Sequence, residues 1–249
     1  MIRAVFFDLD DTLWDFAKTM KHAYSNFSVF LAEKNLPHAA AILGDATLVR
    51  ARLEKIVAKH STNSFGAPFI DYNLVRRDLH RSVFKEVGVN IAHHDEELIN
   101  EQWLNFRASS AQFFPGAIEL LKWLKQQGLI LGAVTNGNAD LNKIPHLPQD
   151  LFSFQTSPGS AGLSKPHPRM YLHAAECAGI SDMSEILFVG DNFENDVKGP
   201  KQVGMRTVFV DWEKSTLHAD ANGFHEHADW VVHDILEVEE IIKSCNQIS

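Results

Sequence analysis

Short, continuous apolar runs alternate with amphipathic segments along most of this chain. Residues 2–7 (IRAVFF), 129–134 (LILGAV) and 186–189 (ILFV) are such runs, and residues 206–210 and 230–232 repeat the pattern. A run that is apolar at every position, rather than at alternate positions, predicts a strand that is buried on both faces. This pattern is typical of a parallel sheet that helices cover on both sides.

The segments between these runs carry apolar residues at helical spacing. In "FPGAIELLKWLKQQG" (114–128), Pro115 stands near the expected helix start and Gly128 just beyond its end. Residues 167–179 form a second helical segment, and a last helix begins near Ile235. Because buried strands alternate with helices, we predict an α/β fold with a Rossmann-like parallel sheet and right-handed crossovers.

A long helical insertion separates the first predicted strand from the others. Residues 48–60 and 72–88 both carry apolar residues at helical spacing, and no convincing strand occurs nearby. We therefore expect an α/β core made of residues 1–14 and 110–249. An α-helical cap domain would occupy residues 15–109.

Polar clusters directly follow three of the predicted strands. The cluster "DLDDT" follows the first, "TNGN" the second and "GDNFEND" the third, while "SKPHP" precedes a helix. Ligands of an open parallel sheet bind outside the carboxyl ends of its strands, so these clusters should share one rim. The rim would then gather Asp8, Asp10, Thr135, Asn136, Lys165, Asp191, Asn195 and Asp196.

The chemistry of this rim favours a hard cation and a phosphoryl group. Several converging carboxylates without a matching His/Cys set fit Mg²⁺ better than a softer metal. The hydroxyl, amide and ammonium groups are suitable donors for a phosphate. One carboxylate can attack phosphorus and form an aspartyl phosphate. A second carboxyl can protonate the leaving oxygen and then activate water.

The four motifs "DLDDT", "VTNG", the lysine of "SKPHP" and "GDNFEND" resemble, in order and separation, those of the haloacid dehalogenase-like hydrolase superfamily. The inserted helices are similar to the cap of the class that includes phosphoglycolate phosphatases. The resemblance implies a Mg²⁺-dependent phosphatase that hydrolyses a small phosphate monoester.

The resemblance also implies a role for each aspartate. Asp8 becomes the nucleophile, and Asp10 becomes the general acid/base, which also lends a main-chain carbonyl to Mg²⁺. Asp191 completes the metal site formed with Asp8 and Asp10. Asp11 lies outside the chemistry on the family pattern.

The remaining rim residues would serve the phosphoryl group. The resemblance implies that Thr135 and Asn136 bind its oxygens and that Lys165 neutralises it. Asp196 would lie behind the metal or orient Lys165, with Asn195 in support. An alternative reading makes Asn195 and Asp196 an N-cap pair for the next helix.

Other functions share parts of this pattern. Carbon–halogen cleavage needs an attacking carboxylate but neither a metal nor a leaving-group acid, so Asp10 favours a phosphatase. A phosphosugar mutase would use the same core, and a non-catalytic binding protein is disfavoured by the intact aspartates and Lys165. Among phosphatases, the motifs resemble most those acting on flavin mononucleotide and a ribitylaminouracil phosphate of riboflavin synthesis; a nucleotide or sugar phosphatase is the alternative.

In the cap, one arginine stands out from its neighbours. Arg76 borders the apolar stripe of its helix, whereas Arg77 and Arg81 point away from it. We expect a solvated face for the latter two and a contact with substrate as a hypothesis for Arg76.

The composition and charge of the chain indicate which kinds of partner it is expected to bind. The chain of 249 residues is 45% hydrophobic and 22% charged, as expected of a soluble globular protein. Its formal charge of −9 argues against nucleic acid, and no apolar run approaches the roughly 20 residues of a membrane span. Cys177 and Cys245 form no CxxC pair, so a reducing cytoplasm is expected. The predicted partner is a small phosphorylated metabolite, and the protein is expected to be a monomer or a homodimer.

Overall fold

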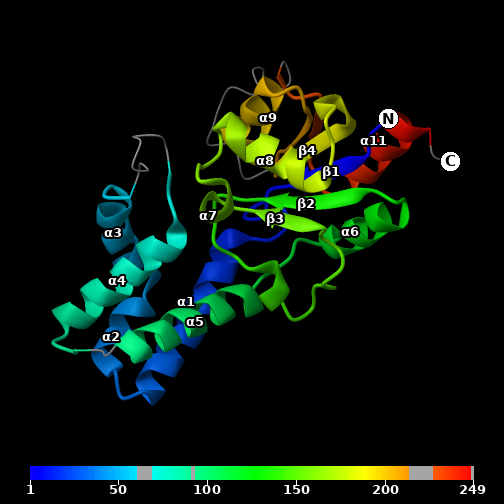
Figure 1. Cartoon of the computed structure of the whole chain (residues 1–249). Coiled ribbons are helices and arrows are strands. Elements are labelled where there is room, and N and C mark those ends of the chain that lie inside the picture. Colours follow the sequence, from blue (N-terminus) through cyan, green and yellow to red (C-terminus); the bar gives the residue numbers. More distant parts are fainter. Residues whose placement is uncertain (61–68, 91–92, 213–226, 248–249) are drawn as a thin grey trace. The chain divides into compact units, whose positions relative to one another are not determined.

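The computed structural model of the protein describes residues 1–60, 69–90, 93–212 and 227–247 (Figure 1). The chain forms two compact units. An α/β unit comprises residues 1–15, 113–136 and 147–249, and a helical unit comprises residues 16–112 and 137–146.

The α/β unit is built on a six-stranded parallel sheet, which confirms the predicted fold class. Its strand order is β3-β2-β1-β4-β5-β6, and every neighbouring pair is parallel. All four residues of the central strand β1 are buried, because helices cover both faces of the sheet. The strands are β1 (Ala4–Phe7), β2 (Ile130–Val134), β3 (Phe154–Thr156), β4 (Ile186–Gly190), β5 (Arg206–Val210) and β6 (Trp230–Val232).

Helices lie on both sides of this sheet (Figure 1). Figure 1 shows α8 (Pro168–Ala178) and α9 (Gly199–Gln202) on one side and α6 (Ala117–Gln126) on the other, where α6 contacts α11 (Glu237–Asn246). Shorter helices are α7 (Pro158–Ala161), η2 (Met183–Glu185) and η3 (Phe193–Lys198), the last of which is a π-helix. The helix α8 packs its Met170 and Tyr171 against Phe6 and Phe188 of the sheet.

The strand β3 is absent from the sequence prediction. It has only three residues, of which two are half-buried, so it lacks the continuous apolar run that marks the other strands. It pairs with β2 at the edge of the sheet.

The helical unit contains α1 (Phe16–Glu33), α2 (Pro37–Leu43), α3 (Ala46–Val57), α4 (Tyr72–Glu86), α5 (His93–Ser109) and η1 (Leu141–Lys143). Asp45 and Asp71 accept hydrogen bonds from the first-turn amides of α3 and α4, which explains where these helices begin. Buried aromatic residues, including Phe27 and Trp103, fill the space between the helices. Across the described residues, no helix combines the length and apolarity that a bilayer crossing requires.

One segment lies in a different unit from the one expected. The sequence assigns residues 137–146 to the core, whereas in the structure they belong to the helical unit. Asn138 Nδ2 donates to Asn73 Oδ1 at 3.2 Å, and Lys143 Nζ donates to Asn105 Oδ1 at 3.0 Å. Hydrophobic periodicity cannot predict these contacts, because they are formed by polar side chains. Residues 110–112, also expected in the core, belong to the helical unit as well.

Candidate active site

The carboxyl ends of β1 and β4 bring the first and last motifs together. The Asp8 amide donates to the Val189 carbonyl at 2.9 Å, so Asp8 extends the ladder between these strands. Asp191 directly follows β4, and its Oδ1 accepts a hydrogen bond from the Thr12 hydroxyl at 2.9 Å. Thr12 ends the "DLDDT" cluster, and its sequence position alone predicted no role for it. Its hydroxyl links the first and last motifs across 179 sequence positions.

A buried lysine joins two of the predicted carboxylates. Lys165 Nζ lies 2.9 Å from Asp8 Oδ1 and 2.8 Å from Asp196 Oδ1, and its side chain is 1% exposed. Burial by itself lowers the pKa of Lys165, but the carboxylates of Asp196 and Asp8 raise it above its usual value. The lysine therefore stays charged at neutral pH.

Asp196 is held on both of its oxygens. Oδ1 accepts from Lys165 Nζ, and Oδ2 accepts from the Asn192 amide at 3.0 Å. A side chain on residue 190 would clash with this carboxylate, because a Cβ added to Gly190 would lie 2.4 Å from the Asp196 carboxyl carbon. The glycine that ends β4 thus permits the close approach of Asp196.

Three carboxylates and one ammonium leave this centre with excess negative charge. Oxygens of Asp8, Asp191 and Asp196 lie within 4.8 Å of one another. Burial raises the pKa of Asp8 well above its ordinary value, and burial together with the Asp196 carboxylate raises the pKa of Asp191 to about 7. A divalent cation would relieve this repulsion. Asp8 and Asp191 are the better ligands, because both Asp196 oxygens already accept hydrogen bonds.

Asp10 lies outside this acidic cluster and is held by a tryptophan. The Trp14 indole Nε1 donates to Asp10 Oδ1 at 2.6 Å, and Trp14 is fully buried against Phe113. Asp11, between them, takes a left-handed conformation with φ of 59° and starts the turn that brings Trp14 back to Asp10. No sequence signal pointed to Trp14, because the contact depends on this turn.

The second and third motifs meet through main-chain hydrogen bonds. Asn136 Nδ2 donates to the Lys165 carbonyl at 3.0 Å, and the Lys165 amide donates to Asn136 Oδ1 at 2.8 Å. The Asn136 side chain therefore fixes the lysine loop. Thr135 follows β2, next to β1, and is 1% exposed.

Asn195 contributes its main chain to the local structure. Its amide donates to Asn192 Oδ1 at 3.0 Å, and its carbonyl accepts from the Tyr171 hydroxyl. Asn192 is therefore the N-cap of η3, and the alternative in which Asn195 and Asp196 form the N-cap pair is not what the structure shows. Both residues lie inside the π-helix, a conformation that is frequent at functional sites.

The chain is similar to known hydrolases. Residues 2–204 match the family model described as haloacid dehalogenase-like hydrolase. A glyceraldehyde 3-phosphate phosphatase of Pyrococcus furiosus is 30% identical over 98% of this chain and 95% of its own length. A phosphoglycolate phosphatase of Xanthomonas campestris is 28% identical, with 84% and 83% covered. The crystal structure of a 2-haloacid dehalogenase from Pseudomonas syringae superposes with a TM-score of 0.74 at 25% identity, covering 98% and 99% of the chains.

Proposed function

Because the chain belongs to the haloacid dehalogenase-like hydrolase family, we propose that it is a Mg²⁺-dependent phosphatase. Its substrate would be a small phosphate monoester, which it would hydrolyse through an aspartyl phosphate. The named relatives that align along most of its length are phosphatases. The observation that carries the proposal is Lys165, buried between Asp8 and Asp196 with Asp191 beside them.

The residues of the site fit a bound Mg²⁺. Asp8 and Asp191 would hold it through carboxylate oxygens and Asp10 through its main-chain carbonyl. When bound, the ion would neutralise the excess charge of the centre and that of a phosphoryl group. The helical unit would serve as the cap that excludes water during the reaction.

The first half of the reaction breaks the ester bond. A carboxylate oxygen of Asp8 attacks phosphorus, the bond from phosphorus to the leaving oxygen breaks, and the Asp10 carboxyl gives its proton to that oxygen. Lys165 keeps the Asp8 carboxylate oriented and offsets negative charge in the transition state. The Thr135 hydroxyl would bind a phosphoryl oxygen. Since the Asn136 side chain is bonded to the main chain of Lys165, Asn136 would contact the phosphoryl group through its own main chain.

The second half releases phosphate. Asp10, now ionised, takes a proton from water, whose oxygen attacks the phosphorus of the aspartyl phosphate. The bond between that phosphorus and the Asp8 oxygen breaks, which regenerates the carboxylate and frees inorganic phosphate. Asp10 is again protonated and ready for the next ester.

The dehalogenase structure makes haloacid hydrolysis a second candidate function. That reaction would also use Asp8 as nucleophile. The Asp8 carboxylate would attack carbon and displace halide, which leaves without the help of a proton donor. The general acid expected at Asp10 would then have no task. The hydrogen bond from Trp14 that holds its carboxylate therefore favours the phosphatase.

A panel of phosphate esters tests the proposal. It contains glyceraldehyde 3-phosphate, phosphoglycolate, nucleoside monophosphates, sugar phosphates and flavin mononucleotide, the last as the substrate proposed from the motifs. A 2-haloacid is included for the second candidate. We expect Mg²⁺-dependent release of phosphate from at least one small ester. Halide release without phosphate release would favour the dehalogenase, and sugar-phosphate isomerisation without phosphate release would favour a mutase.

A further inference from the structure

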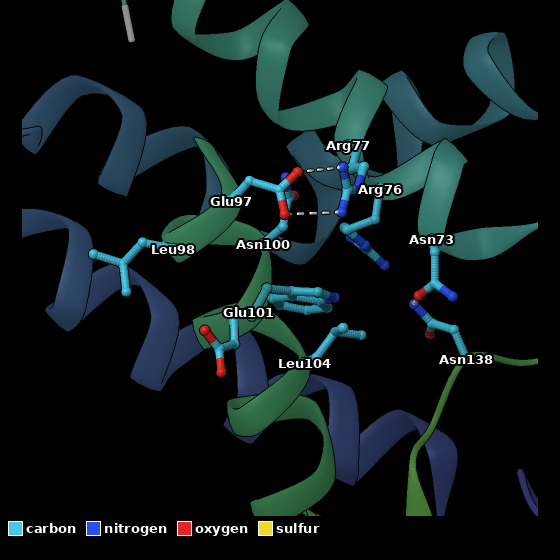
Figure 2. A pocket seen from close by; sticks show the side chains of 10 residues that line it. Asn73, Arg76, Arg77, Glu97, Leu98, Asn100, Glu101, Leu104 and Asn138 are labelled. Atoms are coloured by element: carbon cyan, nitrogen blue, oxygen red, sulfur yellow. Dashed lines mark hydrogen bonds and ion pairs between the residues drawn. The ribbon is translucent and has the colours of Figure 1, made fainter. Parts of the chain in front are cut away.

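The helical unit contains a cavity of its own, with a volume of about 500 Å³. Residues of α4 and α5 and residue 138 line it, and all of them belong to the helical unit. Figure 2 shows Arg76 and Arg77 on α4, where Arg77 pairs with Glu97 of α5.

One wall of this cavity carries the buried positive charge of Arg76. Arg76 is 8% exposed, and its guanidinium carbon lies 4.3 Å from the centre of the Trp103 ring. Its Nη1 donates a long hydrogen bond of 3.4 Å to the Tyr24 hydroxyl. Within the described parts of the chain, Arg76 forms no ion pair with a carboxylate. A buried cation without an ion-pair partner is costly, because it has lost water without gaining a partner charge.

Two further donors on the cavity wall also lack partners. Asn100 is 6% exposed and Trp103 is 1% exposed, yet Asn100 Nδ2 and Trp103 Nε1 donate to no hydrogen-bond acceptor among the described residues. The other end of the Asn100 amide is fixed, because Oδ1 lies 2.7 Å from His80 Nδ1. A buried donor without an acceptor destabilises the fold, because it has lost its hydrogen bonds to water. A neutral acceptor would satisfy these two donors but would leave the Arg76 charge uncompensated.

The remaining charges of the cavity decide which anion fits. Arg77 and Glu97 pair with each other at 2.8 Å and are partly exposed, and Glu101 is exposed, so solvent screens these three groups. The buried, uncompensated charge is thus the single guanidinium of Arg76. A monoanion would match it, whereas a phosphate dianion would bring one negative charge too many.

We propose that this cavity is a binding site for a small organic monocarboxylate, whose oxygens accept hydrogen bonds from Arg76, Asn100 Nδ2 and Trp103 Nε1. The carboxylate can belong to a phosphorylated acid that is the substrate or to a separate acid. The site lies within the helical unit and does not depend on the proposed phosphatase activity.

Binding of glycerate, measured by calorimetry on the full-length protein without Mg²⁺, tests this site. Glyceramide, which has the same shape without the charge, and inorganic phosphate are the comparison ligands. We expect glycerate to bind at least tenfold more tightly than either of them. Equal binding of glycerate and glyceramide would overturn the proposal.

Two arginines of the helical unit provide the matched variants. R76Q should weaken glycerate binding at least tenfold, whereas R52Q should leave it unchanged, because Arg52 pairs with Glu86 and neither residue lines the cavity. N100D is the second test, should R76Q fail to fold: it keeps the side-chain volume but adds a negative charge and should weaken binding equally. Unchanged affinity in a folded R76Q or N100D protein would refute the site.

Kinetics then distinguish the two sources of the carboxylate. If it belongs to the substrate, glycerate should inhibit phosphate release competitively, and R76Q should raise KM more than it lowers kcat. If it belongs to a separate acid, glycerate should bind without competing. Absence of any phosphatase activity would disprove the proposed function and leave the binding measurements to stand by themselves.

Discussion

Lys165 and Asp196 form an ion pair of 2.8 Å in which neither side chain is more than 1% exposed. The lysine reaches the end of β1 from a loop, and the aspartate reaches it from the π-helix η3. Their pairing, shared with Asp8, joins three motifs that are far apart in the sequence. A pair so deeply buried is sensitive to the loss of either partner.

Asp196→Asn should therefore reduce both stability and activity. The substitution keeps the size of the side chain but removes one of the two carboxylates that partner Lys165, and removing one member of a buried pair costs up to about 3–5 kcal/mol. Urea unfolding measures the loss. Glu194→Gln is the matched control, because Glu194 pairs with Lys198 on the same helix but is exposed. Its cost should stay below about 1 kcal/mol. Similar losses in the two variants would contradict this view of the pair.

Gly190→Ala should damage the site through Asp196. The added Cβ would lie 2.4 Å from the Asp196 carboxyl carbon, so the carboxylate must move away from Lys165. We expect a loss of about 1–3 kcal/mol in stability and at least a tenfold loss of activity, read from unfolding and phosphate release. Gly128→Ala is the control: Gly128 has a positive φ but open space around it, so that variant should lose stability without losing activity. Full activity of Gly190→Ala would show that the position of Asp196 does not matter.

Mg²⁺ should raise the melting temperature of the protein, because a ligand that binds only the folded state adds about 2.7 kcal/mol at a hundred times its Kd. Asp191→Asn should largely abolish this shift, since it removes a carboxylate ligand. Asp10→Asn should retain more of it, because residue 10 is expected to offer only its main-chain carbonyl. Thermal melts over a Mg²⁺ titration compare the variants. An equal loss of the shift in both would contradict the assigned ligands.

The helical unit should become less stable in mild acid because of His80. Burial, together with the charge of Arg76, lowers the pKa of His80 from 6.5 in the unfolded chain to about 3. Protonation therefore favours the unfolded state. The contribution of His80 is fully present above about pH 6.5 and falls by about 1.4 kcal/mol per pH unit below it, until pH 3 is approached.

Urea unfolding between pH 7.5 and pH 5 checks this dependence. His80→Gln should flatten the slope, whereas His22→Gln, at an exposed position of α1, should leave it unchanged. A slope that is identical in the wild type and in His80→Gln would show that another group is responsible.

The sheet and the polar residues at the carboxyl ends of its strands could be predicted from the sequence, because both follow from local patterns. Fully apolar runs identify β1, β2 and β4, and the rule that parallel strands end at one rim brings Asp8 near Asp191. The three-residue strand β3 was missed, since it has no such run. Composition and spacing are sufficient to predict a strand where its burial requires apolar residues.

Other contacts could not be predicted, because they depend on tertiary structure. The hydrogen bond from Trp14 to Asp10 requires the left-handed turn at Asp11. The Asn136 side chain holds the main chain of Lys165, a contact that the sequence did not predict. Arg76 borders an apolar stripe in the sequence, but only the packed helices show that it is buried on Trp103 with no ion pair to any carboxylate that the structure describes.

Phosphate release by Asp8→Asn tests the proposed mechanism most directly. It is measured with and without Mg²⁺ on the ester that the wild type hydrolyses fastest. We predict a loss of at least about a thousandfold with the fold retained, because the amide is nearly the same size but cannot act as the nucleophile. Asp182→Asn, at an exposed N-cap in the same unit, should keep wild-type turnover. Turnover by Asp8→Asn close to that of the wild type would contradict the assignment of Asp8 as nucleophile and the aspartyl phosphate with it.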